Sequence, residues 1–224
     1  EIQTNGGFTT YWWHEKYPIA TYLVSVAIHP YEMFYDNYFY DNGTKSMEIQ
    51  FYSFPGNYND NYRINSLVKD MLGCFSDLFG EYPFVDEKYG QADFLWGGGM
   101  EHQTCTSLGY YSESIVAHEL AHQWYGDHIT CDTFHDIWLN EGFATYSEAL
   151  WAEAEYGEEA YFQDMFAEPI LNADDPYVDE IAWCVAHIST SDLQYAHFYA
   201  SLITENASLL YAIDDEVTYA EIVN

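Results

Sequence analysis

Two segments near the start of the chain are rich in the β-branched and aromatic residues that are typical of strands. They cover residues 21–29 and 47–54. The first is apolar almost throughout and is expected to be buried, whereas the second alternates and is expected to be half-exposed. Apolar positions between Ile64 and Phe79 then keep a helical period, and Gly80 followed by Pro83 predicts the end of that helix. We expect this helix to pack under the sheet.

The rest of the chain changes from strand to helical patterns. Residues 92–111 are interpreted as strand and loop, and helices are expected at about 112–127, 136–156 and 196–213, with a loop region over 168–193. Strands that come before helices predict an α+β fold. We expect a mainly sheet lobe over residues 1–111 and a mainly helical lobe over 112–224. A chain of 224 residues can bury a full core, as one domain or a pair of small lobes.

Composition indicates an ordered protein without a membrane span. The hydrophobic fraction is 49%, and no apolar run approaches the ~18 to 20 residues of a membrane helix. Residues 1–4 show no signal peptide. Four cysteines, Cys74, Cys105, Cys131 and Cys184, are too scattered for a disulfide scaffold or a second zinc site. Most are expected to be buried thiols, with one bridge left open; the compartment is unknown, and secreted and high-salt environments both stay open.

Acidic residues dominate the charge. The chain has 5 basic and 37 acidic residues, which gives a formal net charge of −32 at pH 7, and no lysine or arginine follows Lys88. The negative electrostatic field of such a chain disfavours nucleic acid and anionic membranes as partners, and repulsion among its own charges opposes a compact fold. One hypothesis is adaptation to high salt, where the Debye length falls to about 3 Å at 1 M. The alternative is a resurfaced or otherwise modified chain.

The densest candidate chemistry is the HExxH pattern formed by His118, Glu119 and His122. On a helix, positions i and i+4 lie on one face, so both imidazoles can reach one cation. Glu141, nineteen residues after His122, lies in a second helical pattern and can supply a carboxylate as the third ligand. Three protein ligands leave one tetrahedral position of zinc open to water, whose pKa the metal lowers to about 7. Glu119 is placed to take its proton as general base.

The flanks of this pattern are apolar almost all round. They comprise Ile115, Val116, Ala117, Leu120, Ala121 and Trp124. Such a helix is expected to be buried rather than surface-lying. Two histidines and a glutamate would be costly there without a metal or other partners.

The spacing of these residues resembles that of the zinc aminopeptidases related to aminopeptidase N and leukotriene hydrolase, which are gluzincins with a thermolysin-like catalytic domain. Residues 96–104 also resemble that family's exopeptidase loop, usually written GAMEN or GGMEN. The resemblance implies that Glu101 holds the free α-amine of the substrate, while the backbone at Gly98 and Gly99 binds the peptide as an added strand. Met100 and His102 complete the substrate-binding set, and His102 stands where the family usually has asparagine.

The same family has a tyrosine that hydrogen-bonds the developing oxyanion. Tyr199 is similar to it in position, because the acidic run at residues 214–216 follows at the matching offset. Ser201 and Leu202 replace the usual Lys-Gly pair. Tyr195 is the alternative, and a core tyrosine at 199 also stays open.

The resemblance therefore implies a zinc-dependent aminopeptidase with one Zn²⁺ per chain that acts on peptides with a free amino terminus. In that family an amino-terminal β domain and a carboxy-terminal helical domain flank the catalytic domain, and we expect neither in this chain. A catalytically silent gluzincin scaffold, an incomplete catalytic-domain fragment and an epoxide hydrolase are the alternatives. The preferred first residue and the oligomeric state are not indicated by the sequence.

If the acidity reflects adaptation to salt, the midpoint of thermal unfolding should rise between about 0.1 and 1 M sodium chloride, because screening weakens self-repulsion. Circular dichroism melts along a salt series measure it. A parallel series in sucrose separates charge screening from solvent exclusion. A midpoint indifferent to sodium chloride would contradict the adaptation.

Overall fold

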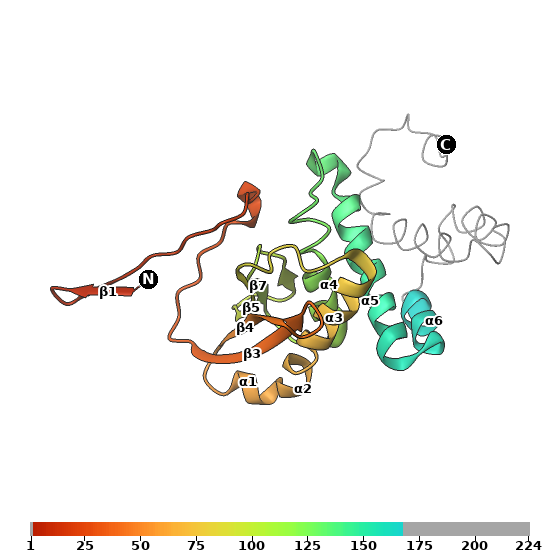
Figure 1. The fold of residues 1–224 in the computed structure, drawn as a ribbon, viewed down its shortest axis with the longest axis horizontal. Helices are drawn as coiled ribbons and strands as arrows, with labels where there is room; N and C mark the ends of the chain where they lie inside the picture. The colour runs from red at the N-terminus through yellow and green to blue at the C-terminus, as the bar shows by residue number, and fades with distance from the viewer. Residues whose placement is uncertain (1, 168–224) are drawn as a thin grey trace.

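A five-stranded mixed sheet lies at the centre of the protein (Figure 1). The computed structural model describes residues 2–167. β3 (Glu32–Tyr40) pairs antiparallel with β4 (Lys45–Ser53), and β4 runs parallel to β5 (Lys88–Asp93). β5 in turn runs parallel to β7 (Thr106–Leu108), which pairs antiparallel with β6 (Gly99–Met100). The order β3-β4-β5-β7-β6 leaves the short strand β6 at one edge of the sheet.

Helices fill the connection between β4 and β5 and follow the sheet. They are α1 (Asn57–Asp60), α2 (Tyr62–Asn65), α3 (Val68–Phe79), α4 (Glu113–Ala121), α5 (Trp138–Tyr156) and α6 (Glu158–Ala167). α3, α4 and α5 contact one another, and α4 also contacts β6 and β7 (Figure 1). The remaining elements are two 3-10 turns, η1 (Thr21–Leu23) and η2 (Phe134–Asp136), and a hairpin of β1 (Ile2–Asn5) and β2 (Phe8–Tyr11) that extends away from the sheet.

The core lies where β4 meets α3 and α4. Alternate side chains of β4 are buried, as the two-residue period of a strand requires. α3 buries four side chains at helical spacing, namely Val68, Met71, Leu72 and Phe75. Burial of each such side chain contributes about 1.5 to 3 kcal/mol. α4 packs against these buried side chains, which fix its position.

Two polar clusters tie α4 to its neighbours. The buried carboxylate of Asp93, at the end of β5, accepts hydrogen bonds from Phe54 N at 2.6 Å and from the Tyr111 hydroxyl at 2.5 Å. Tyr111 immediately precedes the helix. In the first turn of α4, Glu113 forms an ion pair with Arg63 Nη2 at 2.8 Å and accepts a hydrogen bond from Trp151 Nε1 at 3.4 Å. The start of α4 is therefore fixed to β5, α2 and α5.

Several expectations from the sequence are confirmed. The mixed sheet with helices is α+β, residues 47–54 form most of β4 with an alternating burial pattern, and α5 begins and ends close to the predicted helix at 136–156. The helix expected between Ile64 and Phe79 is present but interrupted between α2 and α3. β3, the hairpin and α6 were not expected. No helix among residues 2–167 is both long and apolar enough to cross a membrane.

The prediction of a buried strand over residues 21–29 is wrong. Its beginning forms η1, and only Leu23 of the large apolar side chains is buried, whereas Val26 and Ile28 are 81% and 92% exposed. β-branched residues favour a strand only where a neighbouring strand supplies hydrogen bonds and a surface to pack against. Among the described residues, no strand pairs with this segment.

The helix expected at 196–213 and the loop region at 168–193 lie outside the described residues. The division into lobes at residue 111 stays a prediction.

Candidate metal centre

α4 carries the two motif histidines into the core. Ser112 caps its start by accepting a hydrogen bond from Ile115 N at 3.2 Å, and the apolar residues around the motif are buried except for Ile115, which is half-buried. The helix ends at Ala121 rather than near residue 127, because Gln123 N and Trp124 N donate to oxygens three residues back instead of four. The chain then turns at Gly126, where φ is 140°. A side chain at Gly126 would press on His122. His122 N still donates to His118 O at 3.2 Å, so the two histidines keep their one-turn spacing.

Three side-chain atoms from α4 and α5 converge on one point. Nε2 of His118 and Nε2 of His122 are 3.1 Å apart, and Glu141 Oε2 lies 3.3 and 3.4 Å from them respectively. Four-coordinate zinc with bonds of about 2.0 to 2.1 Å has ligand atoms about 3.3 to 3.4 Å apart. The three atoms therefore have the spacing of three corners of a zinc tetrahedron, and the two imidazoles and one carboxylate suit that metal.

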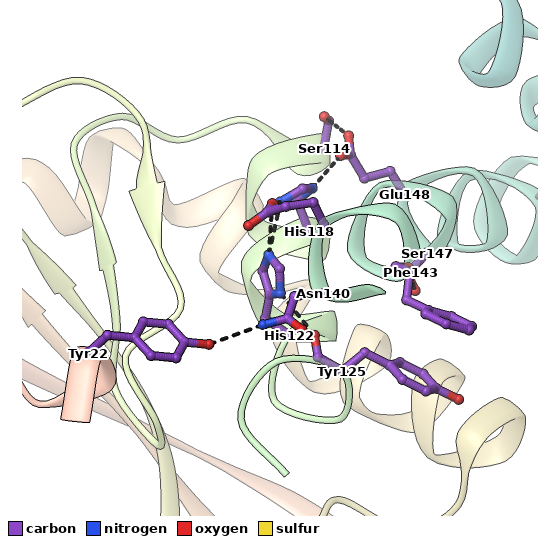
Figure 2. Close-up of polar contacts among 10 residues, drawn as sticks. Tyr22, Ser114, His118, His122, Tyr125, Asn140, Phe143, Ser147 and Glu148 are labelled. Atoms are coloured by element: carbon purple, nitrogen blue, oxygen red, sulfur yellow. Dashed lines mark hydrogen bonds and ion pairs between the residues drawn. The ribbon is translucent and has the colours of Figure 1, made fainter. Parts of the chain in front are cut away.

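The other ring nitrogen of each histidine has its own acceptor (Figure 2). His118 Nδ1 lies 2.8 Å from Glu148 Oε1, and His122 Nδ1 lies 3.0 Å from the backbone oxygen of Tyr125. Both contacts suit a proton on Nδ1, which leaves a lone pair on Nε2 to face a metal. Sequence reasoning missed Glu148. Its signal is its place seven residues after Glu141, which puts both carboxylates on one face of α5.

Electrostatics at this point favour a cation. Burial disfavours a charged His118, but hydrogen bonds to Glu141 and Glu148 outweigh it and raise the pKa of His118 well above its usual value. Burial likewise opposes a charged His122, yet its bond to Glu141 leaves its pKa raised. Glu141 is affected in the opposite sense, since bonds to both histidines overcome burial and hold its pKa far below the usual range. The three groups together therefore favour a positive charge at the point where their ligand atoms converge.

Glu119 lies beside the convergent atoms with its carboxylate buried. Burial raises its pKa to about 7, although the neighbouring His118 and His122 oppose the rise. Its Oε2 has no hydrogen-bond partner among the described residues. A side chain at Gly99 would overlap the Glu119 carboxylate and displace it, so glycine lets β6 pass close to α4 with that carboxylate in place.

Glu101 is brought to the same place from the end of β6. It is buried, and the ligand atoms of Glu101, Glu119 and His122 lie within 4.8 Å of one another. Gln123 holds the loop after Glu101 to the end of α4, because its Nε2 donates to Glu101 O at 3.3 Å and its Oε1 accepts from Thr104 N at 2.9 Å. The position of Glu101 therefore depends on a side chain that the sequence did not single out.

His102 is directed to the sheet. Its Nδ1 lies 2.9 Å from Ser107 Oγ on β7, and burial lowers its pKa despite the nearby Glu101 carboxylate, which favours a neutral ring. Gly98 has a φ of 97°, in the region that favours glycine, and Met100 is half-buried on β6. The structure thus brings Gly98 to Glu101 alongside α4, whereas His102 is held by the sheet.

A further buried acid and a tyrosine lie near the centre, and sequence reasoning found neither. Both carboxylate oxygens of Asp127 are buried without a hydrogen-bond partner among the described residues. Burial, followed by the charges of Glu101 and Glu119, raises the pKa of Asp127 well above its usual value. Figure 2 shows Tyr22 directed towards Asn140, whose Nδ2 donates to the Tyr22 hydroxyl at 3.1 Å. η1 is thereby held against the start of α5.

Tyr199 and its alternative Tyr195 lie outside the described residues, as does Cys184. The other three cysteines are free thiols.

The chain is similar in sequence to known peptidases. The peptidase family M1 domain matches residues 100–187. Aminopeptidase A of Gloydius brevicauda is 26% identical over 221 residues, which are 90% of this chain and 22% of that protein. Aminopeptidase N of Oryctolagus cuniculus is 47% identical over 62 residues, which are 28% of this chain and 5% of that protein. The chain therefore spans only about a fifth of the length of the curated relatives that it matches most fully.

Solved structures match almost the whole chain. An M1 zinc metallopeptidase from Deinococcus radiodurans has a TM-score of 0.65 and 28% identity over 98% of this chain and 48% of its own. A two-domain M1 zinc metallopeptidase variant bound to L-tryptophan has a TM-score of 0.62 and 26% identity, again over 98% of this chain and 48% of its own. These likenesses confirm the α+β fold and support zinc as the metal that the donor set suits.

Zinc affinity should rise with pH, from about pH 6 through the raised pKa values of His118 and His122, because the metal competes with protons for Nε2. Competition with a chromophoric chelator at a series of pH values measures it, and a pH indicator in weak buffer detects the protons released. The chelator's own pH dependence is subtracted with a protein-free series. Affinity that is constant between about pH 6 and 8 would contradict binding through these imidazoles.

Proposed function

Because the chain belongs to the M1 family of zinc metallopeptidases, we propose that it is an aminopeptidase that hydrolyses the first peptide bond of peptides. One observation carries this proposal. One largely buried site brings together the side chains of His118, Glu119, His122, Glu141 and Glu101. These two imidazoles and three carboxylates are the groups that such hydrolysis needs.

In this proposal, His118, His122 and Glu141 would hold one zinc ion, which would polarise the scissile carbonyl as a Lewis acid and lower the pKa of water. The spacing of 3.1 to 3.4 Å among the three donor atoms supports it. Glu119 then accepts a proton from the attacking water and returns it to the leaving amine. The free Oε2 of Glu119, buried without a protein partner among the described residues, supports that role.

Glu101 selects substrates in this proposal. Its buried carboxylate would pair with the ammonium group of a free amino terminus, which a capped or internal peptide lacks. Gly98, Gly99 and Met100 would bind the peptide as an added strand, since β6 is the edge of the sheet. His102, which is held by Ser107, would help to orient the neighbouring Glu101.

Tyr199 remains our candidate for stabilising the oxyanion, with Tyr195 as the alternative. Removal of one such donor commonly lowers the rate by about 10²- to 10³-fold. The competing function is a zinc-binding scaffold or catalytic-domain fragment without activity. Ser201 and Leu202, which stand in the sequence where the family usually has a Lys-Gly pair, favour that alternative. Zinc analysis combined with hydrolysis of a panel of aminoacyl amides distinguishes the two.

Glu119→Gln should leave zinc binding unchanged and lower turnover of an aminoacyl nitroanilide by about 10²- to 10⁴-fold, because an amide accepts no proton from water. Turnover is measured together with the zinc content of each protein. Glu155→Gln, at an exposed position on α5, removes the same charge away from the site and should keep the parent rate. Parent turnover in Glu119→Gln would refute the assignment of the base.

The amine anchor is tested by comparing each peptide with its N-acetylated form. The parent protein should cleave only the free peptide, and Glu101→Gln should lower kcat/KM for it by at least about 30-fold, which corresponds to ~2 kcal/mol for a lost buried charge pair. Glu155→Gln again serves as the matched control. Equal cleavage of acetylated and free peptides by the parent would overturn the aminopeptidase assignment but leave a zinc hydrolase.

A further inference from the structure

We infer that Glu148 is a positioning residue of the metal centre, and that its carboxylate fixes the His118 ring so that Nε2 faces the metal. The inference deepens the proposed function and rests on it, because it concerns the same site. Glu148 belongs neither to the HExxH pattern nor to the three donor atoms that converge.

Both carboxylate oxygens of Glu148 are engaged (Figure 2). Oε1 lies 2.8 Å from His118 Nδ1, and Oε2 accepts a hydrogen bond from the Ser114 hydroxyl. The side chains of His118 and Glu148 are only 14% and 16% exposed, so water competes little for this contact. The carboxylate is therefore held at two points and holds the ring in turn.

The His118 ring lies between two carboxylates from one helix. Its Nε2 is 3.3 Å from Glu141 Oε2, and its Nδ1 is 2.8 Å from Glu148 Oε1. Seven residues separate the two glutamates, so they lie on one face of α5, two turns apart. A proton on Nδ1 that is donated to Glu148 fixes the tautomer, and the ring cannot flip without losing that bond. α5 thus supplies one metal ligand directly and orients a second.

The two histidines differ in this respect. His122 Nδ1 contacts the backbone oxygen of Tyr125 at 3.0 Å, a contact that no side-chain substitution removes. His118 depends on a side chain. Ser114, one turn before His118 on α4, donates to Glu148 in turn. Glu148 on α5 therefore links two residues of α4. Loss of Glu148 should therefore disturb one imidazole and spare the other.

The test compares Glu148→Ala, Glu148→Gln and Ser114→Ala with the parent chain and with Glu155→Gln as the matched control. Zinc affinity is measured by chelator competition at one pH. Removal of such an outer partner typically weakens metal affinity by about 10- to 100-fold, which we expect for Glu148→Ala. Glu148→Gln should lose less, because its amide oxygen still accepts the Nδ1 proton. Ser114→Ala should lose least, and the control should match the parent.

Two further readouts separate positioning from a merely structural role. The visible spectrum of the cobalt-substituted protein should change in Glu148→Ala, since it reports the ligand geometry. The thermal midpoint of the metal-free protein reports general stability. If Glu148→Ala does not fold, Glu148→Leu, which fills similar space without a hydrogen-bond acceptor, decides. Parent affinity together with a parent cobalt spectrum in the decisive variant would overturn the inference.

The outcomes also distinguish this inference from the proposed function. A parent chain that binds no zinc would overturn both. A parent chain that binds zinc and cleaves aminoacyl amides, while Glu148→Ala binds zinc within about threefold of it, would overturn only the role of Glu148.

Discussion

The packing of α4 against α5 brings two imidazoles and a carboxylate to one point inside the protein, and the rest of the site depends on it. Ionisable groups in a buried place are costly unless an opposite charge compensates them. Here the two imidazoles and the Glu141 carboxylate favour opposite charges, because the pKa of each histidine is raised and that of Glu141 is held low. A divalent cation would supply positive charge at this point, and the donor atoms already have the spacing of a zinc tetrahedron.

The sheet contributes by bringing its edge close to this point. β6 passes so near α4 that Gly99 leaves no room for a side chain beside Glu119. Gln123 then fixes the loop that carries Glu101, through one bond to Glu101 O and one to Thr104 N. The proposed base and the proposed amine anchor thus share one wall of the site. A strand edge beside a metal centre gives a peptide both backbone hydrogen bonds and a defined end.

The sequence was sufficient for the residues that local periodicity controls. His118 and His122 were chosen from helix geometry and Glu141 from a second helical pattern, and the structure brings their side chains together. Glu148 was not found, because a carboxylate that contacts a histidine across two helices has no local pattern of its own. Residues 21–29 were predicted wrongly for a related reason. Their β-branched residues describe a preference, but a strand also needs a neighbour, and none of the described strands pairs with them. The end of α4 was overextended because the apolar pattern continues through Trp124, whereas Gly126 turns the backbone.

The position of the metal in crystals of the zinc-equilibrated chain, measured by anomalous diffraction at the zinc absorption edge, tests the proposed metal centre most directly. We expect one peak per chain, about 2.0 to 2.2 Å from His118 Nε2, His122 Nε2 and a carboxylate oxygen of Glu141. A peak coordinated by other residues, or no peak at these three atoms, would contradict it.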